Sequence, residues 1–258
     1  MMMTTEDYEG TTTIVCLHGN GGGAFRFERI FPYQPANTCF QAITLPGFAH
    51  YPADPQLQTL TDYANHLHTL LQEYPRPLIL LGHGIGGSIA LEFGQHYSSE
   101  IDGLILHAPV GTRLERRLFP RLMASPAVRT FGKWLFSSKL ARPLFRRLLF
   151  SQPVPPDYIN RFFDEYRHCT VFEQMFDLIT PHWFETLQPI NLPTALLWGE
   201  RERVLTVDQM ADYKRLFTNP ITRIIPAWDH FPMIEQPESY AKEISRLATE
   251  LHPPPKFG

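Results

Sequence analysis

Residues 78–90 read LILLGHGIGGSIA, and this stretch decides the fold. It starts with an apolar run of strand length, which ends at Gly82. Apolar side chains then recur at helical spacing as Ile85, Ile89 and Phe93. The sequence therefore predicts a buried strand, a tight glycine turn and a helix in immediate succession.

The turn has the spacing of a nucleophile elbow, in which G-x-S-x-G places a serine on a sharp strand-to-helix turn. Gly82 and Gly86 occupy the flanking positions, where small residues let the strand and the helix approach closely. Gly84 stands where the serine belongs; it tolerates a strained backbone but has no side chain that could attack a substrate. The alternatives are the glycine-rich turns of dinucleotide-binding and phosphate-binding proteins, and other motifs must decide.

Composition indicates an ordinary globular protein. The chain has 258 residues, of which 43% are hydrophobic and 19% charged, which excludes a disordered chain and suffices for one α/β domain with an insertion. The net charge of −3 gives no indication of nucleic-acid binding. Three cysteines do not make a closed disulfide framework, and residues 1–10 lack the pattern of a signal peptide. We therefore expect a cytoplasmic location.

Strand and helix patterns alternate over most of the chain, which predicts a mostly parallel sheet with helices on both faces. Besides the central strand, strands are predicted at residues 11–17, 40–45, 103–108, 194–198 and 221–225. Helices are predicted at residues 24–31, 57–71, 85–97, 207–217 and 238–251.

The alternation stops after Pro109, and residues 113–187 show helical spacing interrupted by prolines. This segment is predicted to be a helical cap inserted into the domain. Residues 1–112 and 188–258 would then form the α/β core.

The sequence HGNGGG at residues 18–23 follows the first predicted strand. Backbone N–H groups of such a loop, together with the N–H after the elbow residue, can form an oxyanion hole. The predicted donors are Asn20 and Ile85. The alternative is an ordinary glycine-rich turn, and for His18 we favour a structural role in supporting the loop.

An acid and a histidine follow the last two predicted strands, in WGERERV at residues 198–204 and DHFPMIEQPE at residues 229–238. A carboxylate and a histidine in this chain order can form a base with its orienting acid. We assign these roles to Glu202 and His230, with Glu200 as a nearby competitor. Taken singly, Glu202 would be a solvated charge and His230 a loop histidine; their order favours the catalytic interpretation.

These motifs, with LPGF at residues 45–48, resemble the α/β-hydrolase superfamily in its capped branch of small esterases, lyases and C–C bond hydrolases. The resemblance covers nearly the whole chain. It implies an α/β-hydrolase fold with an inserted helical cap, a nucleophile position at Gly84, the acid at Glu202 and the histidine at His230. The acid is more commonly Asp in that family, and the missing serine puts ordinary esterase chemistry in doubt.

Neither Ser88 nor Cys169 is assigned as a substitute nucleophile, because Ser88 lies one helical turn beyond the elbow and Cys169 reads as a structural thiol. Three interpretations stay open. The protein is a hydrolase-like or lyase-like enzyme that uses the His–Glu pair without a serine, a catalytically silent protein that binds a ligand or partner, or an engineered Ser→Gly hydrolase. No cofactor and no metal are expected, and the expected ligand is a small, mostly apolar, possibly anionic molecule.

Residues 113–147 contain ten basic side chains and one acidic side chain, Glu115, interleaved with large apolar residues. This pattern fits a helix at a membrane surface, or the entrance to a site for an anionic, apolar substrate. The alternative is a plain cap with solvated charges. Nucleic acid is not favoured, since no binding motif accompanies the charge. We therefore expect peripheral membrane contact through the cap.

Overall fold

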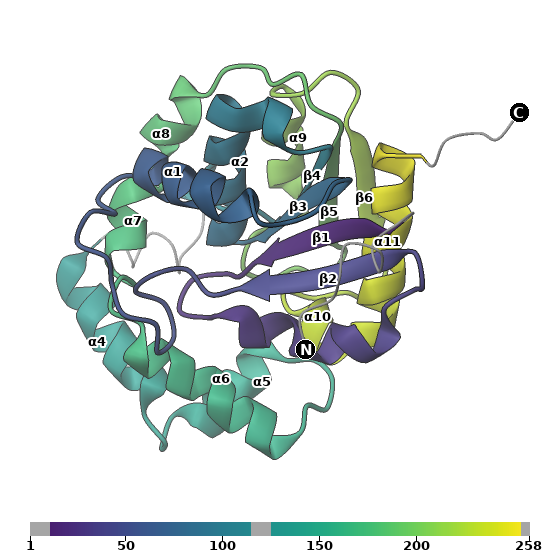
Figure 1. The fold of residues 1–258 in the computed structure, drawn as a ribbon. Helices are drawn as coiled ribbons and strands as arrows, with labels where there is room; N and C mark the ends of the chain where they lie inside the picture. Colours follow the sequence, from purple (N-terminus) through teal and green to yellow (C-terminus); the bar gives the residue numbers. More distant parts are fainter. Residues whose placement is uncertain (1–10, 115–124, 254–258) are drawn as a thin grey trace, which may run out of the picture.

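The computed structural model describes residues 11–114 and 125–253. Six parallel strands form one sheet, in the order β2-β1-β3-β4-β5-β6 (Figure 1). The strands are β1 Thr12–Leu17, β2 Thr38–Ile43, β3 Leu78–His83, β4 Gly103–His107, β5 Thr194–Gly199 and β6 Ile221–Ile225. The fold is an α/β-hydrolase fold, as predicted.

Helices cover both faces of the sheet, because strand residues alternate between two apolar clusters. In β1, Val15 and Leu17 join one cluster, whereas Ile14 and Cys16 join the other. The first cluster is covered by α1 Leu60–Leu71, α2 Ile85–Tyr97 and α9 Met210–Lys214. The second is covered by the 3-10 helix η2 Ala24–Tyr33 and by α10 Pro232–Glu235 and α11 Pro237–Leu251.

In the described part of the predicted cap, five helices lie between β4 and β5: α4 Pro126–Ser137, α5 Arg142–Leu149, α6 Pro156–His168, α7 Gln174–Leu178 and α8 Pro181–Thr186. Figure 1 shows α4 and α6 beyond the end of the sheet to which the arrows of β1 and β2 point. Phe162 and Phe163 of α6 are fully buried in the second apolar cluster, whereas α5 contains no buried residue. We call residues 113–187 the cap segment; its division from the core remains a prediction.

The strand, glycine turn and helix predicted from residues 78–90 are present as β3, Gly84 and α2. Gly84 is the N-cap residue of α2 and has φ 57° and ψ −120°, a backbone conformation that residues other than glycine rarely adopt. A Cβ at Gly82 would lie 2.4 Å from the carbonyl oxygen of Gly86, and a Cβ at Gly86 would lie 2.5 Å from the carbonyl oxygens of Leu17 and His18. The flanking glycines therefore permit the close contact of β3, α2 and β1.

Four predicted elements have wrong boundaries. The helix at 57–71 is α1 Leu60–Leu71, because the Thr59 side chain accepts the Asp62 amide and caps its N-terminus. The strand at 40–45 is β2 Thr38–Ile43, because Leu45 has left the ladder and its amide donates to His18 Nε2. The helix at 24–31 is the 3-10 helix η2, which contains Pro32 and ends at Tyr33. The helix at 207–217 is divided into the 3-10 turn η5 Val207–Gln209 and α9, and Phe217 instead forms an isolated parallel bridge with Ile190.

None of the described helices combines the length and the apolar character that crossing a membrane requires.

Candidate active site

Glu202 and His230 form a buried hydrogen-bonded pair. Glu202 follows β5 and His230 follows β6, and His230 Nδ1 lies 2.7 Å from Glu202 Oε2. Both residues are at most 9% exposed. The second oxygen, Glu202 Oε1, accepts the backbone N–H groups of Val204 at 2.7 Å and Leu205 at 3.0 Å. This geometry allows Nδ1–H to donate to the carboxylate, and in that tautomer the lone pair lies on Nε2.

The two loops that hold this pair are joined by backbone contacts. The Arg201 amide donates to the Trp228 carbonyl at 2.9 Å, and a Cβ at Gly199 would lie 2.3 Å from the same oxygen. Glycine at the end of β5 therefore allows the loops to meet. Glu200 is exposed, and in this geometry Glu202, not Glu200, reaches the histidine.

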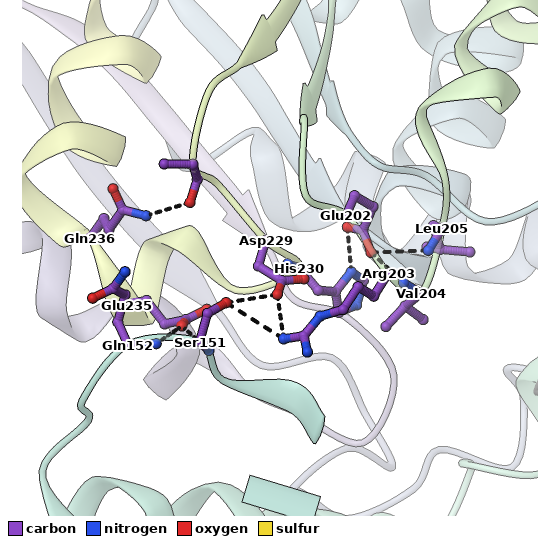
Figure 2. Close-up of polar contacts among 11 residues, drawn as sticks. Ser151, Gln152, Glu202, Arg203, Val204, Leu205, Asp229, His230, Glu235 and Gln236 are labelled. Carbon is purple, nitrogen blue, oxygen red and sulfur yellow. Dashed lines mark hydrogen bonds and ion pairs between the residues drawn. The ribbon is translucent and has the colours of Figure 1, made fainter. Parts of the chain in front are cut away.

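A second carboxylate, Asp229, connects the histidine loop to the cap segment (Figure 2). Asp229 Oδ1 accepts the His230 amide at 2.9 Å, and Asp229 Oδ2 accepts the Ser151 hydroxyl at 2.8 Å. Arg203 forms an ion pair with the same Oδ2. Glu235 Oε1 accepts the backbone amide of Ser151 at 2.6 Å. The loop after α5 is therefore fixed to the element that carries His230.

Sequence reasoning gave no role to this network. Asp229 could have been suspected, since it is adjacent to His230 in the DHFPMIEQPE motif. Ser151 has no comparable signal, because 78 residues separate it from Asp229.

Gly84 directly follows His83, the last residue of β3, whose ring contacts His230. The imidazole rings of His83 and His230 have centroids 4.7 Å apart, so the elbow and the histidine loop meet. Apart from its chain neighbours, only one described atom, Gly19 Cα at 3.5 Å, would contact a Cβ at position 84. There is thus room for a side chain where the glycine stands.

The two other residues considered as nucleophiles have structural positions. Ser88 is fully buried in α2, and its hydroxyl donates to the Val110 carbonyl at 2.6 Å. Cys169 is also fully buried, and burial raises the pKa of its thiol to about 11. A thiol with that pKa stays protonated at neutral pH and is a poor nucleophile.

The HGNGGG loop lies against both the core and the cap segment. Asn20 Nδ2 donates to the Phe172 carbonyl at 3.1 Å, and a Cβ at Gly21 would lie 2.2 Å from the Tyr166 ring. Ile85 is the first residue of α2, where a backbone N–H has no partner within the helix. The roles predicted for the Asn20 and Ile85 amides remain proposals.

His18 is fully buried, and its ring supports the loop. Nδ1 lies 3.0 Å from the Gly19 carbonyl, and Nε2 accepts the Leu45 amide at 3.2 Å. Burial lowers the pKa of His18 to about 4, so the ring is neutral near pH 7. This geometry agrees with the structural role that we favoured.

Two further buried histidines were not identified from the sequence. The His83 ring contacts both the His230 and the His107 ring, with centroid distances of 4.7 and 4.8 Å. Burial, with a smaller contribution from His230, holds the pKa of both His83 and His107 below the usual value, to about 3 for His107. A neutral His83 ring therefore contacts the His230 ring and adds no positive charge there.

Aromatic rings cover the pair from the side of the cap segment. Phe231 lies 4.5 Å from the His230 ring and 5.1 Å from Phe162, measured between centroids. The Arg26 guanidinium lies 3.5 Å from the Phe162 centroid and forms a buried ion pair with Glu165 at 3.1 Å. Among the described residues, Arg26 Nη1 has no hydrogen-bond partner. The sequence gave no indication of this arginine, because its partners come from α6.

In the described part of the chain, one cluster of side chains has the donor atoms and the spacing to hold a metal ion. Ligand atoms of His50, Asp164 and His168 lie within 4.8 Å of one another, on residues that are exposed or half-buried. The cluster shares no residue with the Glu202–His230 pair.

Comparison with known proteins adds the following. The sequence model described as "Alpha/beta hydrolase family" matches residues 14–243. A Drosophila melanogaster "Probable serine hydrolase" is 31% identical over 96 residues, which are 36% of this chain and 29% of that protein. "Uncharacterized hydrolase YugF" of Bacillus subtilis (strain 168) is 21% identical over 92% of this chain and 89% of its own length. A crystal structure of "a membrane phospholipase A, a novel bacterial virulence factor" has a TM-score of 0.75 at 23% identity, covering 95% of this chain and 81% of that chain.

Proposed function

The chain belongs to the Alpha/beta hydrolase family, and from that premise we propose that it cleaves a small, mostly apolar substrate without forming an acyl-enzyme. His230 acts as the general base and Glu202 as its orienting acid. The backbone amides of Asn20 and Ile85 hold the oxyanion.

In this mechanism His230 Nε2 removes a proton from a water molecule as the water oxygen adds to the substrate carbonyl carbon. The carbonyl electron pair moves to the oxygen that the Asn20 and Ile85 amides bind. When the tetrahedral intermediate collapses, the leaving group takes the proton from the His230 imidazolium. Glu202 stabilises that imidazolium and keeps the ring in the required tautomer.

The observation that carries the proposal is the hydrogen bonding of Glu202. One oxygen lies 2.7 Å from His230 Nδ1 and the other accepts two backbone amides, so the carboxylate cannot rotate without losing three contacts. A buried carboxylate held in this way orients a base whether or not a serine follows. The room beside Gly84 supports the proposal, since a water molecule needs the space that a serine side chain would otherwise fill.

The expected turnover is slow. In a serine triad, loss of the serine costs about 10⁶ in kcat, and the oxyanion hole with substrate binding retains about 10³–10⁴ over the reaction in water. A base that acts on water can add a further factor of about 10²–10⁴. Activated esters are therefore the appropriate first substrates.

The side chains near His230 favour an apolar substrate with one polar or anionic group. Phe231, Phe162 and Phe150 form contacting rings above His230, with centroid distances of 5.0–5.5 Å among them. Arg26 Nη1 is a buried donor beside those rings. The name serine hydrolase, which one relative has, agrees with an ester or a related acyl compound as the substrate.

The test is a panel of p-nitrophenyl esters and thioesters assayed with the protein as given, with His230→Ala and with Gly84→Ser. We expect slow, saturable turnover in the given protein that His230→Ala abolishes. Silence in the given protein, with activity appearing in Gly84→Ser, would instead identify a silent or engineered hydrolase. Turnover that is indifferent to His230 would refute the assignment of the base.

A further inference from the structure

We propose that α4, α5 and the residues linking them form a docking surface for an anionic lipid bilayer. We call this the docking surface and define it by Phe131, Trp134, Lys139, Leu140, Leu144, Arg146, Arg147 and Leu148. The inference goes beyond the proposed function, and it holds whether or not the Glu202–His230 pair is catalytic.

The first observation is the concentration of exposed apolar side chains. Nine large hydrophobic residues are exposed in the described part of the chain, and five of them lie on the docking surface. Their exposed fractions range from 54% to 94%, in Phe131, Trp134, Leu140, Leu144 and Leu148. The surface of a soluble protein rarely exposes so many large apolar side chains within one stretch of 18 residues, here 131–148.

The second observation is the distribution of apolar side chains around α5. Phe145 and Leu149 are partly buried against the second apolar cluster, and these two side chains pack the helix onto the rest of the protein. Leu144 and Leu148 form a separate stripe, four residues apart, and both are exposed. Arg147 is exposed between them on the same side of the helix. This helix therefore carries more apolar surface than its own packing uses.

The third observation is charge. Residues 126–149 contain six of the chain's 23 basic residues and none of its 26 acidic residues. Lys139, Arg146 and Arg147 are exposed, and no described carboxylate forms an ion pair with any of them. Positive charge beside exposed aromatic and aliphatic side chains matches the chemistry of an anionic bilayer surface. The acidic remainder of the chain favours one orientation, with the docking surface toward the lipid.

The structure reduces the number of charges that the sequence suggested for this role. Arg113 forms ion pairs with Asp208 and Asp212 of the core, and Arg129 is buried in an ion pair with Asp177. Lys133 donates to the Cys169 carbonyl, and Arg142 donates to Asn160 Oδ1 at 3.2 Å. Arg116, Arg117 and Arg121, with Glu115, lie outside the described residues.

The test is co-sedimentation of the full chain with vesicles of phosphatidylcholine, alone or with about 30 mol% phosphatidylglycerol. We expect binding to the anionic vesicles, weakened but not abolished by raising the salt from about 0.05 to about 0.3 M, because only the electrostatic part is screened. Replacing Lys139, Arg146 and Arg147 with Glu should weaken binding more than about 100-fold, at about fivefold or more for each charge. The matched control replaces Lys214, Arg215 and Lys242, exposed basic residues of the core, with Glu.

Trp134 reports insertion directly. It is 63% exposed, whereas Trp198 and Trp228 are at most 1% exposed and Trp183 is partly buried. Anionic vesicles should shift the emission to shorter wavelength, and Trp134→Phe should remove the shift. Replacing Leu140, Leu144 and Leu148 with Ser should reduce binding at least about tenfold while thermal unfolding stays unchanged, since all three are exposed.

Several results would overturn the proposal. They are equal binding to neutral and anionic vesicles, no binding to either, and equal loss in the docking-surface and control charge variants. A dimer in size-exclusion chromatography that the three Leu→Ser changes dissociate would assign the surface to a second copy of the chain instead. Capture of a purified acidic protein without vesicle binding would assign it to a protein partner.

Discussion

Placing a serine at position 84 tests the role of the elbow and the role of His230 as a base in one variant. Gly84 has φ 57°, and a non-glycine residue held in such a conformation costs about 1–3 kcal/mol. No steric cost is added, because a Cβ there meets only Gly19 Cα, at an ordinary contact distance of 3.5 Å. Gly84→Ser should therefore fold, with a free energy of unfolding lower by about 1–3 kcal/mol in urea denaturation.

We expect the serine hydroxyl to be reactive, because position 84 directly follows His83, whose ring contacts the His230 ring. We expect a fluorophosphonate probe to add once per molecule of Gly84→Ser, as measured by intact-protein mass spectrometry. The double variant Gly84→Ser/His230→Ala should not react, since the base is gone. Gly84→Ala has the same backbone strain without a hydroxyl, so it serves as the matched control for stability and should remain unlabelled.

Two results would refute this reasoning. A folded Gly84→Ser protein that remains unlabelled would show that His230 is not aligned with the elbow. A loss of stability far above 3 kcal/mol would show that the room described beside Gly84 is absent.

Three further predictions concern the residues around the site. His18 and His107 have pKa values of about 4 and about 3, below the usual 6.5, so the unfolded chain binds more protons in acid. Stability should be complete above about pH 7 and fall as the pH is lowered, by about 2 kcal/mol for each histidine at pH 5; equal free energies of unfolding at the two pH values would contradict this. Glu165→Ala leaves the buried Arg26 cation unpaired and should cost about 3–5 kcal/mol in urea denaturation, and a loss below about 1 kcal/mol would argue against the ion pair. Asp229→Asn retains one acceptor for the His230 amide but loses the ion pair with Arg203, so the free energy of unfolding should fall by about 1–3 kcal/mol, and an unchanged value would mean that this ion pair adds nothing to stability.

The fold could be predicted from the sequence because local patterns specify it. Apolar runs of strand length alternate with helical spacing, and parallel strands must alternate with crossover helices. The error at β2 arose because Thr38 is polar at the start of a strand, although it pairs with Thr12 in the register. Hydrophobic pattern alone does not detect such a pairing.

Those parts of the candidate site that follow from the order of the motifs could be predicted. The parts that depend on tertiary contacts could not. Glu202 and His230 follow consecutive strands, whose carboxyl ends lie at one edge of the sheet. Arg26 meets Glu165 only because α6 folds over η2, since the two residues are 139 positions apart in the chain. For the same reason, the sequence analysis included Arg113 and Arg129 in the basic patch without their acidic partners. These partners, Asp212 and Asp177, are distant in sequence.

The central claim is that Glu202 orients His230 as a base that acts without a nucleophilic serine. The most direct measurement is kcat and KM for the best ester of the panel, with the protein as given and with Glu202→Gln. The glutamine amide cannot hold the Nδ1–H tautomer as the carboxylate does, so we predict a fall of about 10³–10⁴ in kcat with little change in KM. A Glu202→Gln protein that is folded and turns over at the rate of the given protein would contradict the claim.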